Sequence, residues 1–181
     1  MKCSAIFPLG LILGAARAIN MTDYAPTCGI DREFKRWYRE LLGAFEDPTT
    51  TDSITSFFAP GGALILGGSN FTGGEAILAA RGAILPADRS IQWNHFPNIT
   101  VVASETPINK SFEVTGVLQI TLSANASCST TYANGATQSY QTLFTVEKNL
   151  ATGRANLAPQ GGSLIRYDGL SVNSTNDQCI K

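Results

Sequence analysis

The chain has 181 residues, which is enough for one domain with a sizeable hydrophobic core. Its 13 basic and 14 acidic residues nearly balance and give a formal net charge of −1. No basic patch appears along the chain, so neither nucleic acid nor an anionic membrane surface is expected as a partner.

Residues 1–18 have the pattern of a secretory signal peptide. Lys2 supplies the positive charge, Ile6 to Ala15 form a short apolar stretch, and Ala16-Arg17-Ala18 matches a cleavage site. The apolar stretch is shorter than the roughly 18 apolar residues that a membrane-spanning helix needs, and no later stretch reaches that length. We therefore predict a secreted protein with no membrane span.

Six sequons for N-glycosylation follow the predicted signal peptide. Sequons occur by chance, but six of them behind a signal peptide predict a glycoprotein of the secretory pathway. The acceptor residues are Asn20, Asn70, Asn98, Asn109, Asn125 and Asn173.

The cysteines allow a disulfide but do not determine which residues it joins. Cys3 would leave with the signal peptide, so Cys28, Cys128 and Cys179 remain, enough for one disulfide and one free thiol. A Cys28–Cys179 bridge would tie the two ends of the domain together, and the other two pairings stay open. Three scattered cysteines and a single histidine lack the spacing of a zinc site, so no metal is expected.

The clearest predicted helix spans residues 31–45, after an irregular N-terminal arm at 19–30. Asp31 can cap its start and Gly43 lies near its end. Apolar residues recur at helical spacing and form one continuous stripe that should face the core. The stripe consists of Phe34, Trp37, Tyr38, Leu41, Leu42 and Phe45.

Short elements follow. A helix is predicted from Thr51 or Asp52 to Phe58, then a turn at residues 59–62 and a strand at Ala63–Leu66 that Gly67-Gly68 closes. Another helix should run from Glu75 to about Ala80 or a little beyond. The glycines here lack the spacing of a phosphate-binding loop, so turn chemistry explains them better.

Long strands begin near residue 90. Ile91–Ser104 alternates between apolar and polar residues, and this pattern places Trp93 and the only histidine, His95, on the inward face. Asn98 must face outward if it carries a glycan. Pro97 is a position where a bulge could slip the register by one residue. Without a slip, the other inward residues are Ile91, Ile99, Val101 and Ala103.

The remaining strands are predicted at Ser111–Ser123, Gln138–Glu147 and Ser163–Tyr167, with a polar hairpin loop at 124–137. Gly116 is a gap in an apolar face, where a ligand or helix could approach or the strand could bend. The inward faces of the first two strands consist of Phe112, Val114, Leu118, Ile120 and Leu122, and of Tyr140, Thr142, Phe144 and Val146.

Helices come first and long antiparallel strands follow, which predicts an α+β domain. We expect N-terminal helices packed on a strongly curved antiparallel sheet, a cone-shaped α+β barrel over residues 31–169. A polar C-terminal tail should occupy residues 170–181.

The chain resembles the nuclear-transport-factor-two-like superfamily of cone-shaped α+β domains, which includes SnoaL-like polyketide cyclases, scytalone dehydratase and ketosteroid isomerase. The resemblance covers roughly residues 30–169, and the secretory features make the chain look like a fungal-type member. These motifs specify a fold better than a chemistry. They are the opening helix, SFFAPGGALILGGSNFTGGEAI at Ser56–Ile77, the strand that starts at WNHFPN, and LIRYDG at Leu164–Gly169.

The resemblance implies a cofactor-free cyclase, isomerase or dehydratase that acts on a small apolar metabolite, polyketide- or terpenoid-like, by acid–base catalysis in the cone. Leu66 and Gly67 match the position of the isomerase aspartate, and the second histidine of the dehydratase is missing. His95 is therefore the expected catalytic residue, and it would act without the aspartate and without a second histidine. The expected substrate-binding residues are Trp93, Tyr38, Tyr140 and Thr142.

The missing aspartate and the missing second histidine motivate an alternative. A non-catalytic secreted glycoprotein could use the cone to bind a ligand or the sheet to bind a protein, and His95 would then be a structural core residue. The resemblance also implies a possible homodimer through the exposed face of the sheet. A cavity of roughly a few hundred Å³ with His95 on its wall would favour the enzyme, whereas a filled cone would argue against it.

Overall fold

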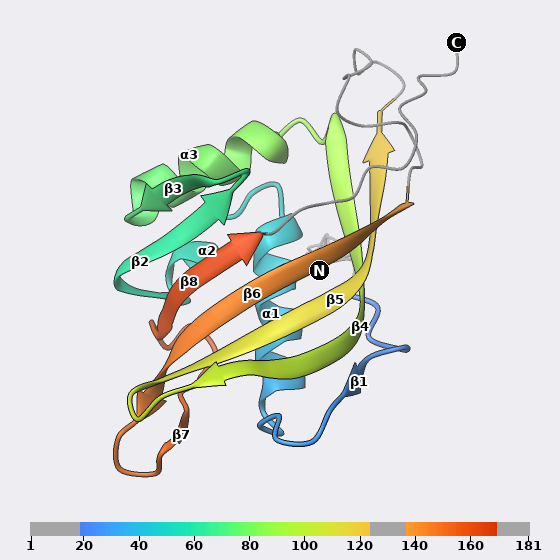
Figure 1. Ribbon diagram of the computed structural model, residues 1–181. Coiled ribbons are helices and arrows are strands. Elements are labelled where there is room, and N and C mark those ends of the chain that lie inside the picture. Colours follow the sequence, from blue (N-terminus) through green and yellow to red (C-terminus); the bar gives the residue numbers. More distant parts are fainter. Residues whose placement is uncertain (1–18, 124–136, 170–181) are drawn as a thin grey trace, which may run out of the picture.

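The computed structural model describes residues 19–123 and 137–169, which fold around one curved sheet (Figure 1). The helices are α1 (Phe34–Glu46), α2 (Asp52–Thr55) and α3 (Gly74–Ile84). The strands are β1 (Ala25–Pro26), β2 (Phe58–Leu66), β3 (Ser69–Thr72), β4 (Ile91–Glu105), β5 (Asn109–Leu122), β6 (Thr137–Asn149), β7 (Arg154–Ala155) and β8 (Leu164–Gly169). The predicted α+β class is confirmed.

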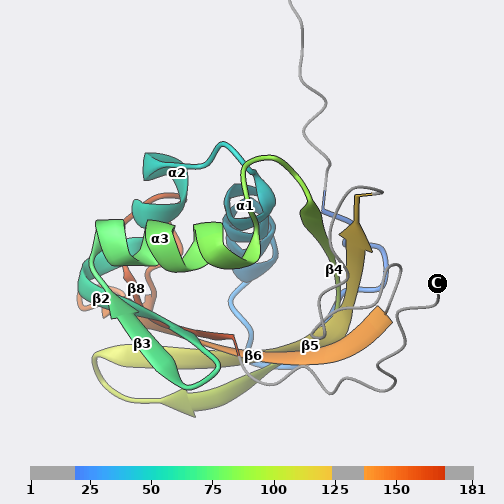
Figure 2. The same cartoon turned by 90° about the horizontal axis from the view of Figure 1, so that it is seen from above.

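The strand order in the sheet is β1-β4-β5-β6-β8-β2-β3, and β7 pairs with β6 outside this path. The long strands β4, β5 and β6 are antiparallel neighbours, whereas β2 pairs with β8, and β1 with β4, in parallel. The sheet curls around α1, and all three helices lie on its concave side (Figures 1 and 2). This is the predicted arrangement of helices that close a curved sheet.

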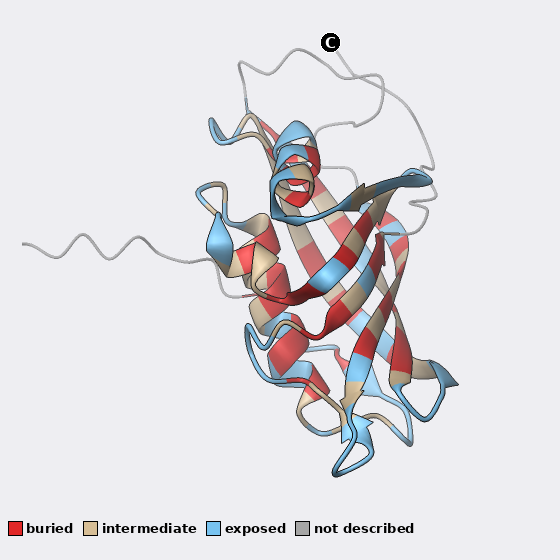
Figure 3. Cartoon of the chain, turned by 90° about the vertical axis from the view of Figure 1, so that its left-hand side faces the viewer, coloured by how far each residue is buried: buried red, intermediate tan, exposed pale blue. Residues whose placement is uncertain are grey.

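The apolar stripe of α1 fills the space between helix and sheet. All six of its predicted residues are at most 1% exposed. Buried residues alternate with more exposed ones along β6 and most of β5, so that one face of the sheet packs on the helices (Figure 3). The predicted inward residues of β5 and β6 are all buried.

The ends of α1 differ from the prediction. The helix begins at Phe34 and runs one residue beyond Phe45, to Glu46. Asp31 makes no cap with its side chain, because its carboxylate binds Nζ of Lys110 at 2.8 Å. A buried ion pair to a neighbouring strand competes successfully with a local helix cap.

β4 contains the bulge that Pro97 suggested. The pairing of β4 with β5 shifts between Pro97 and Ile99. Beyond the shift, Thr100 is fully buried and Ile99 is 45% exposed, so the expectation that Ile99 and Val101 face inward is wrong. One extra residue in a strand turns every later side chain to the opposite face.

The region before β4 contains more strand residues than predicted, because its glycines were interpreted as turn residues. Residues 59–62 belong to β2 rather than to a turn, and α2 ends at Thr55 instead of Phe58. A Cβ atom on Gly62 would lie 2.5 Å from the carbonyl oxygen of Leu164, so glycine permits the close approach of β8 there. The predictions missed β1, β3 and β7, because strands of two to four residues are too short to show an alternation.

Several predictions fall outside the described residues. They concern the signal peptide at 1–18, the loop at 124–136, the tail at 170–181, and the residues Cys128, Cys179, Asn125 and Asn173. Cys28 is exposed and forms no disulfide with another described residue. Asn20, Asn70 and Asn98 are exposed and Asn109 is half-buried. In the described ranges, no helix has both the length and the apolar character to cross a membrane.

Candidate active site

His95 and Glu46 form a buried pair between the sheet and α1. Oε1 of Glu46 lies 2.6 Å from Nδ1 of His95 and also accepts a 3.0 Å hydrogen bond from the backbone N–H of His95. The two side chains are 6% and 9% exposed. A charge-assisted hydrogen bond shielded from water in this way is stronger than one at the surface.

The pair joins segments that are far apart in the sequence. His95 lies near the start of β4 and before the bulge, so it keeps the inward direction that the alternation predicted. Glu46 ends α1, one helical turn beyond Leu42. It therefore extends the buried stripe of the helix by one more position toward the sheet.

Glu46 determines which ring nitrogen of His95 is available for chemistry. An ionised carboxylate only accepts hydrogen bonds, so Nδ1 donates its proton to Glu46 and a neutral ring keeps a lone pair on Nε2. Among the described residues, none makes a hydrogen bond to Nε2. Such an imidazole can accept a proton at Nε2 and return it, while Glu46 stabilises the imidazolium.

Two tyrosine hydroxyl groups share a hydrogen bond beside this pair. The hydroxyl oxygens of Tyr38, from α1, and Tyr140, from β6, are 3.0 Å apart. The ring of Tyr140 stands edge-on to His95, with ring centroids 5.0 Å apart. Both tyrosines are among the substrate-binding residues that the resemblance implies; Tyr140 contacts the ring of His95, and Tyr38 contacts Tyr140.

Burial keeps these hydroxyl groups protonated. Loss of solvent raises the pKa of Tyr38, Tyr140 and Tyr167 above the usual range of a phenol, and the nearby carboxylate of Glu46 adds to the rise. A phenol with a raised pKa remains a hydrogen-bond donor across the physiological range. A substrate carbonyl that reached this cluster would meet both neutral hydroxyl donors and the imidazole.

The other predicted site residues differ in position. Trp93 is half-buried and its ring is 6.1 Å from His95 and 6.2 Å from Phe45, so it forms part of an aromatic wall. Thr142 is buried on the same face of β6 as Tyr140, one inward position further along the strand. Its direct neighbour on β5 is Val114.

The predictions missed Glu46 and Tyr167. Glu46 falls at the spacing of the apolar stripe, and an acidic residue at a stripe position is the signal that could have identified it. Tyr167 lies in the closing strand, where it is buried against Phe45 and Phe144. No local pattern separates it from an ordinary core residue.

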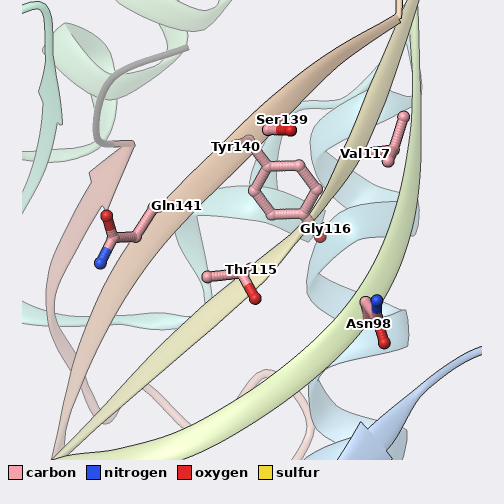
Figure 4. Close-up of a pocket in the computed structure, with 7 residues that line it drawn as sticks. All are labelled: Asn98, Thr115, Gly116, Val117, Ser139, Tyr140 and Gln141. Carbon is pink, nitrogen blue, oxygen red and sulfur yellow. The ribbon is translucent and has the colours of Figure 1, made fainter. Parts of the chain in front are cut away.

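A pocket of about 360 Å³ opens beside this cluster, on the outer face of the sheet. Figure 4 shows Asn98 of β4, Thr115 and Val117 of β5, and Ser139 and Gln141 of β6 around the ring of Tyr140 and the backbone of Gly116. Neither His95 nor Trp93 lines it, so this is not the cavity expected in the cone. Its floor is nevertheless Tyr140, one of the buried cluster.

The described residues include no group of three or more histidine, cysteine or acidic side chains that could hold a metal ion. The side chains that gather at the site supply one imidazole, one carboxylate and three phenols.

No protein-family model matches the sequence, and a comparison with curated proteins gives no match either. Solved structures do match. Aln2 from a Streptomyces species is 16% identical, with a TM-score of 0.53 over 75% of this chain and 86% of that chain. A ketosteroid isomerase-like protein from Erwinia carotovora is also 16% identical, with a TM-score of 0.52 over 81% of this chain and all of that one.

The chain has the nuclear-transport-factor-two-like fold. A third relative of this fold, from Catenulispora acidiphila, was solved in complex with S-DNPA. It is 14% identical, with a TM-score of 0.50 over 75% of this chain and 87% of that one. In the nuclear-transport-factor-two-like fold of this chain, α1 and the inner faces of β4, β6 and β8 converge on one interior. Those elements carry Glu46, His95, Tyr140 and Tyr167.

Proposed function

We propose that the protein is a cofactor-free cyclase, isomerase or dehydratase that moves a proton on a small, largely apolar metabolite. His95 serves as the acid and base through Nε2, Glu46 orients its ring, and the hydroxyl groups of Tyr38 and Tyr140 stabilise a developing oxyanion. The observation that carries the proposal is the 2.6 Å contact between Glu46 and His95, two buried side chains in an aromatic interior.

Geometry favours proton transfer over nucleophilic attack. The described cluster holds an oriented base and neutral donors, which is the pattern for enolisation next to a carbonyl. The likeness to a ketosteroid isomerase-like protein supports this class, and the complex of the Catenulispora relative with S-DNPA supports a small-molecule ligand. His95 is only 5% exposed, so little open surface leads a substrate to Nε2.

Secretion is part of the proposal. The signal-like residues 1–18 and the exposure of Asn20, Asn70 and Asn98 support an extracellular glycoprotein, as a fungal-type member of the superfamily would be. Treatment of the protein secreted by a eukaryotic host with an N-glycosidase should lower its mass. An unchanged mass, or retention of residues 1–18, would contradict this part.

The catalytic part is tested by exchange of hydrogen at carbon next to a carbonyl. The protein is incubated in D₂O with a panel of apolar cyclic ketones, and deuterium uptake is followed by mass spectrometry. We expect His95→Gln and Glu46→Gln to slow the exchange by roughly 10²- to 10⁴-fold, the usual contribution of an oriented acid–base group. Glu33→Gln removes an exposed carboxylate just before the start of α1, so it is the matched control and should exchange like the wild type.

An equal rate in His95→Gln and in the wild type would remove His95 from the mechanism. No exchange with any ketone would favour the second candidate, a non-catalytic binding protein. The outer pocket favours that candidate, because its lining offers uncharged amide and hydroxyl groups beside Val117. Native mass spectrometry of the secreted protein would then reveal a retained ligand, and also whether the protein is a homodimer.

A further inference from the structure

Arg81 of α3 is a buried cation that the proposed chemistry does not use. It is 3% exposed, and its guanidinium group donates three hydrogen bonds, all to backbone carbonyl oxygens. Nε binds the carbonyl of Phe45 at 2.9 Å, Nη2 that of Asp47 at 2.6 Å, and Nη1 that of Leu85 at 2.8 Å. An arginine is seldom buried without a carboxylate partner, so this arrangement requires a physical reason.

Two of the three carbonyls flank Glu46. Phe45 and Asp47 are its neighbours on either side, and the backbone leaves the helix at Asp47 with extended angles (φ −69°, ψ 114°). The last carbonyl groups of a helix have no partner within the helix and tend to fray. Arg81 satisfies one such group, the carbonyl of Phe45, and also binds the carbonyl of Asp47, which accepts the N–H of Thr50 at 3.0 Å as well. It thereby ties the residues on both sides of Glu46 to α3.

Arg81 acts on Glu46 through the backbone. Burial lowers the pKa of the Arg81 guanidinium, and the negative charge of Asp47 opposes that effect. No described ion pair joins Arg81 to Glu46. The planar fork of an arginine can reach three carbonyls in fixed directions, whereas the single ammonium group of a lysine cannot.

We propose that Arg81 is a positioning residue that holds the end of α1 so that Glu46 meets His95. The inference rests on the proposed function for its catalytic meaning, but the geometry it claims can be measured without a substrate. Removing Arg81 lets the end of α1 move, the Glu46 carboxylate leaves Nδ1, and the ring of His95 loses its fixed tautomer.

The chain offers an unusually clean probe, because His95 is its only histidine. Nitrogen-15 NMR of the imidazole reports the tautomer directly, and a proton in a short N–H···O bond appears at low field. Spectra are recorded at about pH 8.5, well above the usual pKa of an imidazole. The wild type should show a protonated Nδ1 with a low-field proton and an unprotonated Nε2.

The variants are Arg81→Lys and Arg81→Met, each checked for folding by circular dichroism. Arg81→Lys keeps the charge and most of the stem, so it is the variant expected to fold. Lys110→Met is the matched control. Lys110 is 8% exposed and donates to a backbone carbonyl, that of Gly29, and to Asp31, but it lies at the other end of β5 from Leu118, the partner of His95.

We expect both Arg81 variants to lose most of the low-field Nδ1 signal and to shift toward the Nε2-protonated tautomer, while Lys110→Met keeps the wild-type spectrum. An unchanged spectrum in Arg81→Lys would overturn the role of the arginine fork. Loss of the signal in Lys110→Met as well would show that general loosening of the fold is responsible, and would also overturn the proposal.

Measuring deuterium uptake by the ketones with the same variants distinguishes a failure of this inference from a failure of the proposed function. We expect kcat to fall on the order of 10²-fold in Arg81→Lys with little change in KM, as for a catalytic group displaced by about 1 Å. A lost Nδ1 signal with undiminished exchange would refute the catalytic role of the Glu46–His95 pair and leave the positioning role standing. An intact signal with reduced exchange would refute the positioning role.

Discussion

At the scale of single residues, the polar groups of the interior depend on one another in pairs. Glu46 satisfies both the backbone N–H and the ring of His95, and Tyr38 and Tyr140 satisfy each other. A buried polar group that loses its partner costs free energy, whereas a pair removed together costs much less. The tyrosine pair allows this dependence to be measured.

Tyr38→Phe and Tyr140→Phe should each lower the free energy of unfolding by about 1–3 kcal/mol, because each leaves one buried hydroxyl group without its partner. The double variant should lose less than the sum of the two single losses. Urea denaturation of the four proteins measures this coupling. Tyr167→Phe is the control, since no described residue hydrogen-bonds its hydroxyl group, and additive losses at positions 38 and 140 would contradict the pairing.

At the scale of elements, the β4 bulge and Gly116 of β5 lie next to each other in the sheet. Gly116 lies on β5 opposite Pro97, where the bulge begins, and beneath the ring of Tyr140. A Cβ atom there would lie 2.4 Å from the carbonyl oxygen of Phe96 and 2.8 Å from the hydroxyl oxygen of Tyr140. The groups that approach Gly116 are the carbonyl of Phe96 on β4 and the side chain of Tyr140 on β6, so the expected approach of a ligand or a helix is not what the glycine accommodates.

Gly116→Ala should therefore lower the free energy of unfolding by about 1–3 kcal/mol, as overpacking of a tight site does. The carbonyl of Phe96 is part of the backbone and cannot move aside cheaply. Gly82→Ala, in α3, is the matched control, because nothing lies within 4 Å of the added methyl group. That change should raise stability by about 0.5–1 kcal/mol, since alanine favours a helix. Thermal melts of both variants check the opposite signs.

At the scale of the whole molecule, three phenols are enclosed between one sheet and one helix. Their folded-state pKa values are raised mainly by burial, whereas in the unfolded chain they return to about 10. Below that value both states hold the protons, and stability is independent of these groups. Above it, only the unfolded state releases protons, so the free energy of unfolding must fall as the pH rises.

We expect a decline of up to about 4 kcal/mol per pH unit above pH 10 from the three tyrosines together, at about 1.4 kcal/mol for each. Urea unfolding at a series of alkaline pH values measures the slope. Lysines also titrate in this range, so the Tyr38→Phe/Tyr140→Phe protein provides the reference. Its slope should be shallower by about two thirds of the tyrosine contribution, and an equal slope would contradict the burial of these phenols.

Local patterns predicted most of the fold. The α1 stripe and the alternation of β5 and β6 each depend on the spacing of apolar residues within one segment, and the structure confirms those faces. They also predicted the direction of His95, because it precedes the bulge in β4. Residues after the bulge were placed on the wrong face, since a strand's own sequence does not specify the register of its partner.

The sequence by itself determined which side chains are buried together on α1, β5 and β6, because burial there follows from periodicity along a single helix or strand. Only the tertiary structure decided which of them meet. Glu46 and His95 are 49 residues apart, and Tyr38 and Tyr140 are 102 apart. Contacts between residues so far apart depend on how the sheet curls and on where α1 ends. Neither of these can be predicted from the sequence of a single helix or strand. The sequence identifies His95 as a candidate residue, because it is the only histidine. Only the folded chain shows that Glu46 is its partner and that Arg81 binds the residues on both sides of Glu46.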